Sequence, residues 1–251
     1  GTTSNLYVNE SGTNYVGWAW KANGSGSSNG NGSIAATVSA NTTAGFSVGT
    51  YTGNGTDNAT VGHGLGGADM VWVKRLNTTG NWRVYEKSSN LDFFLDLTNA
   101  GTSPTEIKST SATTFTLGSG NGFNGSSDSH VFYAFQSIDG FSKISSFTGN
   151  GSTDGPFVPT GFEVAWLLIK RASGGTGNWD IFDNQRDPIN VADAVIDADT
   201  SAAEATFSTI KIDLLSNGFK IRGTQSNINN SGDTYIYMAF AETPFKTANA
   251  R

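Results

Sequence analysis

The side chains that could carry out chemistry are few and scattered along this sequence. The chain has two histidines, His63 and His130, and no cysteine. The lack of cysteine excludes thiolate nucleophiles, thiolate zinc sites and disulfides. A catalytic or metal-binding histidine needs partner groups around it, and the sequence shows no such grouping. We therefore expect both histidines to be packing or surface residues and the protein not to be an enzyme.

Carboxylates are the next candidates. Paired carboxylates can hydrolyse glycosides, and an acidic belt occurs at Asp183, Asp187, Asp193, Asp197 and Asp199. Its spacing does not distinguish a catalytic pair from a solvated loop, and we favour the loop. A polysaccharide depolymerase therefore remains the least favoured function.

Two matching glycine-rich loops could bind a metal. They are residues 53–57, ending in Asp57, and residues 149–154, ending in Asp154. Oxygen-rich glycine loops can hold calcium, which makes Ca²⁺ the one cofactor to consider. Both loops lack the closely spaced acidic ligands of a strong calcium site, so plain turns with asparagine in the left-handed region explain them better.

Aromatic residues beside turns are candidates for stacking on a sugar. Trp82 and Trp179 each follow a Gly-Asn pair, and Tyr85 lies three residues after Trp82. An exposed ring at a loop edge can stack on a glycan. A tryptophan at the edge of the core, with its N–H bonded to the backbone, is the commoner alternative.

The elements that position these residues are arranged as an internal duplication. Matched segments, about a hundred positions apart and in the same order, are 45–47 with 140–142, 51–55 with 147–151, 71–75 with 167–171, 80–82 with 177–179 and 131–135 with 236–240. The extra length of the second copy lies mostly between Trp179 and Phe207. Five landmarks in one order indicate two copies of one unit.

A partial third copy opens the chain. Residues 14–20 match 234–240, so residues 1–22 resemble the last hairpin of a preceding unit. This hairpin, with Tyr15, Trp18 and Trp20, could complete the sheet of a neighbouring subunit. Residues 23–43, which include a run of Gly, Ser and Asn, are typical of a flexible linker or a long surface loop.

The local patterns predict strands. Residues 70–73 and 164–169 are continuous apolar runs, as expected of central strands buried on both faces, whereas 115–117 and 219–222 alternate apolar and polar residues. Asn-Gly pairs at 54, 121, 150 and 217 predict hairpin turns, and residues 201–205 have at most one turn of helix. The fold class is therefore all-β. We expect two tandem β-sandwich, jelly-roll-like domains at 44–138 and 139–246, with a tail at 247–251.

Composition narrows the functional class. Only 14% of residues are charged and the net charge is −6, whereas a nucleic-acid binder would show a basic stripe. No apolar run approaches the roughly 20 residues of a membrane span. We therefore expect no nucleic-acid partner and no membrane insertion.

Residues 15–24, 37–47, 60–66 and 235–246 resemble a family of repeat domains, of unknown activity, that is common in phage and viral-metagenome structural proteins. The similarity covers nearly the whole chain. It implies a virion or extracellular location and a tail-fibre-like structural role, and it supplies no catalytic residues.

The leading hypothesis is therefore a virion appendage or tail-fibre module. It would form a homo-oligomer, contact other virion proteins and attach to a host through cell-surface glycan. The alternative is the protomer of a self-assembling extracellular filament, formed by strand donation.

Overall fold

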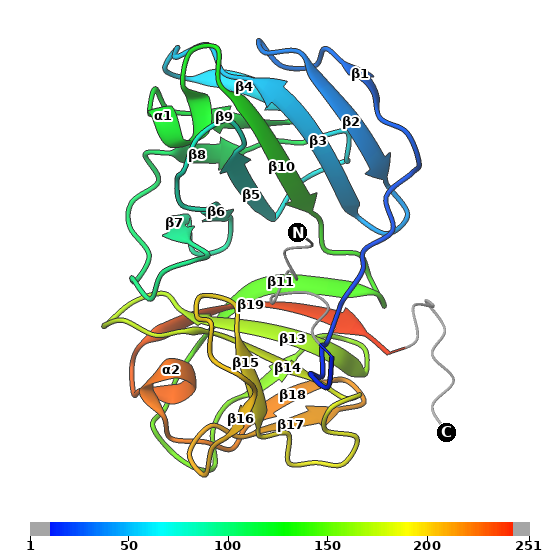
Figure 1. Cartoon of the computed structure of the whole chain (residues 1–251). Helices are drawn as coiled ribbons and strands as arrows, with labels where there is room; N and C mark the ends of the chain where they lie inside the picture. The colour runs from blue at the N-terminus through cyan, green and yellow to red at the C-terminus, as the bar shows by residue number, and fades with distance from the viewer. Residues whose placement is uncertain (1–10, 243–251) are drawn as a thin grey trace.

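The computed structural model describes residues 11–242, and these residues form two β-sandwich units stacked one on the other (Figure 1). Each unit, called repeat 1 and repeat 2 here, has a large main sheet and a small three-stranded sheet. All pairings between the named strands are antiparallel. Within the described range, no helix is long and apolar enough to cross a membrane.

Repeat 1 contains the first ten strands. Its main sheet has the spatial order β1 (Ser27–Asn29), β2 (Ala36–Asn41), β3 (Phe46–Thr52), β10 (Ser129–Phe135), β5 (Met70–Arg75), β6 (Arg83–Glu86) and β7 (Leu91–Phe94). Its small sheet has the order β4 (Ala59–Gly62), β9 (Thr114–Leu117) and β8 (Ile107–Thr110). A single helical turn, α1 (Asn121–Asn124), precedes β10.

Repeat 2 has the same topology, except that its main sheet has no counterpart of β1 and β2 and adds one strand, β16 (Ala205–Thr206), at the other edge. Its main sheet has the order β11 (Ser142–Thr148), β19 (Thr234–Ala241), β13 (Val164–Arg171), β14 (Trp179–Asp183), β15 (Ala194–Asp197) and β16 (Ala205–Thr206). Its small sheet has the order β12 (Phe157–Pro159), β18 (Gly218–Ile221) and β17 (Ile212–Leu215), and its helical turn is α2 (Ser226–Asn229). The series β3-β10-β5-β6-β7 therefore matches β11-β19-β13-β14-β15, which agrees with the landmarks expected from the sequence.

The central strands are buried on both faces, as their continuous apolar runs predicted. In β5, Val71 and Val73 face the interior of repeat 1, while Met70 packs on the opposite face. In β13, Leu167 faces the interior of repeat 2 and Leu168 packs on the opposite face. Successive side chains of a strand point to opposite faces, so each main sheet contributes to two hydrophobic cores.

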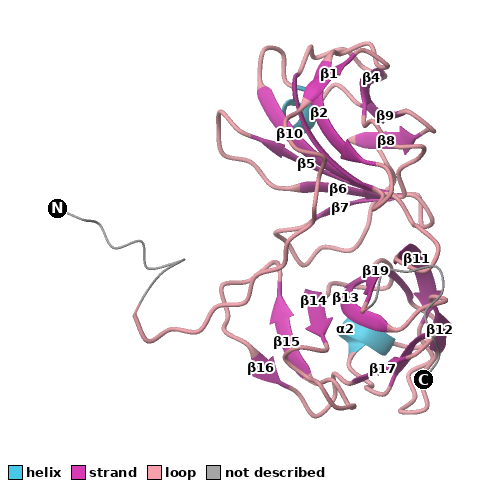
Figure 2. Cartoon of the chain, turned by 90° about the vertical axis from the view of Figure 1, so that its right-hand side faces the viewer, coloured by secondary structure: helices cyan, strands magenta, loops and turns pink. Residues whose placement is uncertain are grey.

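A third core lies between the two repeats, and we call it the inter-repeat core. It joins the outer faces of the two main sheets, which lie opposite each other in Figure 2. Its buried members are Phe46, Met70, Val84, Phe93 and Phe135 from repeat 1 and Ile144, Trp166, Leu168, Ala172, Trp179, Ile181, Ile236 and Met238 from repeat 2. The molecule is therefore four sheet layers deep, with one core between each neighbouring pair.

The prediction of a linker at residues 23–43 is wrong, because these residues contain strands β1 and β2. Ala36 and Val38 of β2 point into the core of repeat 1. The glycine-rich segment before β2 is fixed by Ser39, whose Oγ donates to the Gly24 carbonyl (2.7 Å) and accepts from the Asn23 N–H (3.0 Å). Composition suggested flexibility, but the alternation in 36–38 is enough to add a hairpin to the edge of the sheet.

Two further expectations fail locally. Residues 13–22 contain no strand, and the rest of the expected hairpin, residues 1–10, lies outside the described part of the chain, as does the tail at 247–251. The Asn121-Gly122 pair begins α1 instead of closing a hairpin. The 201–205 segment has no helix, within the expected limit of one turn, and it ends in β16. Asn54-Gly55 and Asn150-Gly151 also close no hairpin: each has positive φ at its glycine but joins strands of two different sheets. By contrast, Asn217-Gly218 lies in the β17–β18 hairpin, as predicted.

Candidate binding site on the outer face of repeat 1

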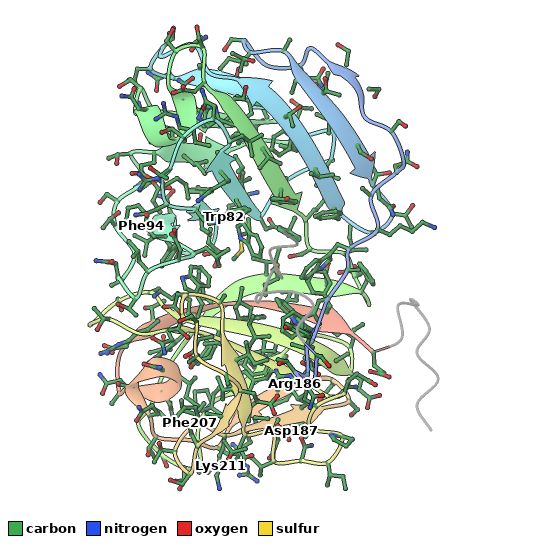
Figure 3. The ribbon with its side chains drawn as sticks, viewed as in Figure 1. Trp82, Phe94, Arg186, Asp187, Phe207 and Lys211 are labelled. Atoms are coloured by element: carbon green, nitrogen blue, oxygen red, sulfur yellow. The ribbon has the colours of Figure 1, made fainter. Side chains whose placement is uncertain are left out.

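An aromatic pocket of about 410 Å³ lies on the outer face of the main sheet of repeat 1. The lining consists of six aromatic residues and one leucine: Trp20, Phe46, Trp72, Trp82, Leu95, Tyr133 and Phe135. Of the residues expected to bind a glycan, only Trp82 lines this pocket. In Figure 3, Trp82 lies on the side of repeat 1 that faces repeat 2.

The alternation of three neighbouring strands builds the pocket. Phe46 on β3, Trp72 on β5 and Tyr133 on β10 all point away from the core of repeat 1, because residues two apart share one face of a sheet. In the ladder, Tyr133 is opposite Trp72. Rings on adjacent strands are therefore contiguous, and Trp82 and Leu95 extend the surface toward the β6–β7 edge.

Trp82 is held at the rim by two interactions. Its backbone N–H donates to Asp96 Oδ1 (3.1 Å), and the Lys74 ammonium lies 5.5 Å from the centre of its ring. Lys74 Nζ also donates to the Gly80 carbonyl. The Tyr133 ring is 6.0 Å away at a tilt of 32°. The indole is therefore fixed in direction while its side chain remains partly exposed.

The pocket contains few polar groups, and they are mainly indole and phenol groups. Trp72 Nε1 is buried and has no hydrogen-bond partner among the described residues. Aromatic surface with a buried, unused N–H suits an apolar ligand that brings a hydrogen-bond acceptor, since an unmade hydrogen bond in a buried site costs free energy.

The N-terminal arm, residues 11–22, closes one side of the pocket. Trp20 lies 6.0 Å from Phe135 of repeat 1, 5.5 Å from Trp166 and 5.8 Å from Phe240 of repeat 2, measured between ring centroids. Trp18 lies 6.2 Å from Trp166. The prediction that Trp18 and Trp20 face a neighbouring subunit is therefore wrong here, because aromatic rings of the same chain receive them. Tyr15 remains 49% exposed.

Trp179 and Tyr85 cannot stack on a sugar in this structure. Trp179 is fully buried in the inter-repeat core, and its Nε1–H donates to the Phe94 carbonyl (2.8 Å). Tyr85 points into the core of repeat 1, with its hydroxyl 3.0 Å from Asn90 Oδ1. The sequence places both rings beside turns, but it does not show that a second unit covers one of them.

Asp57 and Asp154 each form an ion pair with a lysine instead of a metal site. Asp57 accepts from Lys108 Nζ at 2.6 Å, and Asp154 is 2.8 Å from Lys220 Nζ. The lysine lowers the pKa of Asp154. Across residues 11–242, no group of three or more His, Asp or Glu side chains is placed to hold a metal ion.

Both histidines are buried packing residues. His63 Nδ1 accepts the Leu65 N–H (3.1 Å), and His130 stacks on Tyr51 with ring centroids 4.9 Å apart. Burial lowers the pKa of both imidazoles. Both imidazoles are therefore neutral at pH 7, and both are buried within repeat 1.

The acidic belt also has structural roles. Asp183 accepts the backbone N–H groups of Gln185 and Arg186 and pairs with the Arg186 guanidinium (2.7 Å). Asp187 accepts the N–H groups of Asp193 and Ala194. These carboxylates stabilise the loop between β14 and β15.

Sequence reasoning found the rim of the pocket but missed its floor. Tyr133 and Phe135, two positions apart on β10, carry the signal that could have revealed it: a strand whose outward face is aromatic. That pattern alone does not distinguish a pocket from a buried interface, and in this protein the same sheet face contributes to both.

Comparison with known families gives one result. A family model described as a domain of unknown function, DUF7483, matches residues 1–244. No curated protein and no solved structure shows a significant match. Since the match covers nearly the whole chain, the protein belongs to the DUF7483 family.

Proposed function

We propose that the chain is a non-catalytic docking module of an extracellular assembly, in which repeat 1 binds another protein component through the pocket around Trp82. The observation that carries this proposal is the aromatic lining of that pocket on a rigid sheet. The similarity of the sequence to phage structural proteins favours a virion appendage, such as a tail fibre, as the assembly.

Packing between the two repeats supports a docking role because it holds the pocket rings in place. Phe46 and Phe135 on the pocket floor are also members of the inter-repeat core. Their positions are therefore fixed by packing between the repeats, and little side-chain entropy remains to be lost when a partner binds.

A protein partner fits the lining better than a glycan. Sugar hydroxyls need several hydrogen-bonding side chains around a stacking ring, and the lining here offers indole and phenol groups on an otherwise hydrocarbon surface. Aromatic anchors in well-packed pockets are typical of the centre of protein–protein interfaces.

The proposal is tested by locating the chain. Immunogold labelling of virions or filaments from the source that encodes it should decorate an appendage, and Trp82→Ala should reduce incorporation while the variant still folds. Glycan-array binding that depends on Trp82 would instead make the module a host-glycan adhesin. Polysaccharide cleavage lost in Asp183→Asn or Asp187→Asn would make it a depolymerase.

A second candidate, a filament built by strand addition, has one observation in its favour. Strand β11 ends the main sheet of repeat 2, whereas its counterpart β3 is covered by β2. Ile138 and Ser142 exchange both backbone bonds at the outer edge of β11, so alternation directs Ser146 to that edge as well.

Strand addition at β11 predicts concentration-dependent assembly that Ser146→Pro abolishes, since proline removes an outward N–H. A sedimentation series that finds a monomer at all concentrations would eliminate this candidate.

A further inference from the structure

The two repeats contain the same constellation of three groups around a tryptophan. In each, a lysine ammonium lies 5.5 Å from the centre of the indole ring and donates to a glycine carbonyl, while the tryptophan backbone N–H donates to an aspartate Oδ1 at 3.1 Å. The residues are Lys74, Gly80, Trp82 and Asp96 in repeat 1, and Lys170, Gly177, Trp179 and Asp199 in repeat 2.

In repeat 2 this constellation is already occupied by a peptide segment of the same chain. Residues 93–98 of repeat 1 cover it, with the Phe93 ring 5.8 Å from Trp179 at 75°. The Phe94 carbonyl accepts the Trp179 indole N–H (2.8 Å), and the Leu97 carbonyl accepts from Lys170 Nζ (3.3 Å). Trp179 therefore contacts an apolar ring and donates to one main-chain carbonyl, while Lys170 donates to a second.

One more backbone bond completes this internal complex. The Gly177 N–H donates to the Thr98 carbonyl at 3.0 Å. Residues 93–98 thus present a ring followed by carbonyls at Phe94, Leu97 and Thr98, which together satisfy the donors around Trp179. Phe94 lies near Trp82 in Figure 3, at the lower edge of repeat 1.

In repeat 1 no segment within residues 11–242 covers the same constellation in this way. Trp82 and Lys74 are partly exposed, no hydrogen bond involves the Trp82 indole N–H within residues 11–242, and Lys74 Nζ donates to a single carbonyl, that of Gly80. The groups that bind residues 93–98 in repeat 2 therefore have unused counterparts in repeat 1.

Repeat 2 does not supply the missing cover. The segment of repeat 2 that corresponds to residues 93–98 is 196–201, because Leu95 pairs with Trp82 through the same backbone bond that joins Ala198 to Trp179. Its sequence is Ile-Asp-Ala-Asp-Thr-Ser, with aspartate in place of Phe94 and threonine in place of Leu97. A segment with this charge would not suit an aromatic pocket.

We infer that the Trp82 pocket binds an extended apolar peptide segment of the kind found at residues 93–98, presented by a neighbouring protein. This inference rests on the proposed docking function and names the chemistry of the partner. An aromatic side chain packs against the Trp82 ring, one main-chain carbonyl accepts the Trp82 indole N–H, and a second accepts from Lys74. Residues 93–98 of the same molecule are already engaged with repeat 2, so the occupant comes from another chain.

The probe is a synthetic peptide with the sequence of residues 92–100 and blocked ends, added to the full chain labelled with ¹⁵N. The protein has six tryptophans, and their indole N–H signals are resolved by heteronuclear NMR. Saturable, one-to-one movement of the Trp82 indole signal is expected. The Trp179 signal should stay in place, because its site is filled internally.

Matched variants and a matched peptide control the result. Trp82→Ala should weaken binding at least tenfold and Lys74→Met about fivefold, while Lys143→Met, on the exposed part of β11, should have no effect. A peptide with the sequence of residues 195–203, the counterpart in repeat 2, should not bind.

Two outcomes would overturn the inference: no shift of the Trp82 signal at millimolar peptide, or binding that Trp82→Ala leaves unchanged. If the peptide fails while Trp82→Ala still blocks incorporation into the particle, the partner chemistry is wrong and the docking function stands. If incorporation is also unaffected, both are wrong.

Discussion

At the scale of single residues, two buried asparagines explain why the glycine-rich loops recur. Asn124 Nδ2 donates to the carbonyls of Thr56 (2.9 Å) and Gly118 (2.8 Å), and its Oδ1 accepts the Asn54 N–H (3.0 Å). Asn229 repeats this network around the second loop. Each loop is tied to its helical turn by a buried side-chain amide, so the loops are structural.

Asn124→Ala should destabilise the protein by about 3 kcal/mol, because it leaves buried loop carbonyls and one N–H without partners, each costing about 1–3 kcal/mol. Urea unfolding followed by tryptophan fluorescence measures the loss. Asn121→Ala, an exposed position in the same helical turn, is the control and should change stability by less than about 0.5 kcal/mol. Equal losses in the two variants would contradict the role assigned to Asn124.

Asp180 is a buried carboxyl group whose effect on the free energy of unfolding depends on pH. It is fully buried, and neither carboxylate oxygen has a hydrogen-bond partner among residues 11–242. Burial raises the pKa of Asp180 well above its usual value, and the carboxylate of Asp197, opposite it on β15, raises it further. The folded state therefore holds a proton that the unfolded chain releases near pH 4, and the stability from this group is lost as pH rises.

Asp180→Asn should remove this loss of stability with rising pH. The difference in unfolding free energy between variant and wild type should grow in favour of the variant above pH 4, by up to about 1.4 kcal/mol per pH unit, until the wild-type carboxyl ionises. Denaturant titrations at pH 4, 5, 6 and 7 give the slope. Asp139→Asn, at an exposed position, should run parallel to wild type, and a pH-independent gap for Asp180→Asn would refute the explanation.

At the scale of elements, the N-terminal arm joins the two repeats. Trp20 contacts rings from both main sheets, and the Arg186 guanidinium lies 5.9 Å from the ring of Trp18. The arm is also fixed to repeat 1 by a hydrogen bond from Asn41 Nδ2 to the Lys21 carbonyl (3.0 Å). Residues 14–20 have the sequence of a strand, but they form part of none of the four described sheets.

Trp20→Ala should lower the stability of the folded chain by about 2 kcal/mol, since each aromatic pair is worth about 0.5–1.5 kcal/mol beyond its buried area. It should also speed proteolytic cleavage within residues 11–25. Val16→Ala, at a position that is 41% exposed, is the matched control. Cleavage at equal rates in both variants would show that Trp20 does not hold the arm.

At the scale of the whole molecule, the inter-repeat core makes the two sandwiches one cooperative unit. Met238 and Leu168 of repeat 2 are buried in it together with Met70 and Phe93 of repeat 1. Each sheet face would expose a large apolar surface if the repeats separated. We therefore expect one thermal unfolding transition for the full chain.

Met238→Asp should divide that transition in two. A charge buried without a partner costs several kcal/mol, and the easiest relief is separation of the repeats with each internal core retained. Differential scanning calorimetry should show two peaks. Lys143→Asp, on the exposed part of β11, should keep the single peak, and a single peak for Met238→Asp at a lower temperature would contradict the two-unit description.

The sequence alone determined the all-β class, the duplication and the central strands, since these depend on periodicity, turn residues and repeated landmarks, all of which are local. It also placed Trp82 beside a turn at the edge of a sheet. The prediction of a linker at 23–43 was wrong because the glycine and serine content outweighed the short alternation in β2. Residues 14–20 were predicted as a strand because a local sequence pattern does not show whether a partner strand is present.

Only the tertiary structure decided which of two equivalent tryptophans is exposed. Trp82 and Trp179 have nearly the same local sequence and the same lysine, glycine carbonyl and aspartate around them. Their fates differ because residues 93–98 of repeat 1 lie across the sheet of repeat 2, while the corresponding segment 196–201 is too polar to cover repeat 1. Whether each tryptophan is buried depends on the surface that lies opposite it, and the local sequence around either tryptophan does not specify that surface.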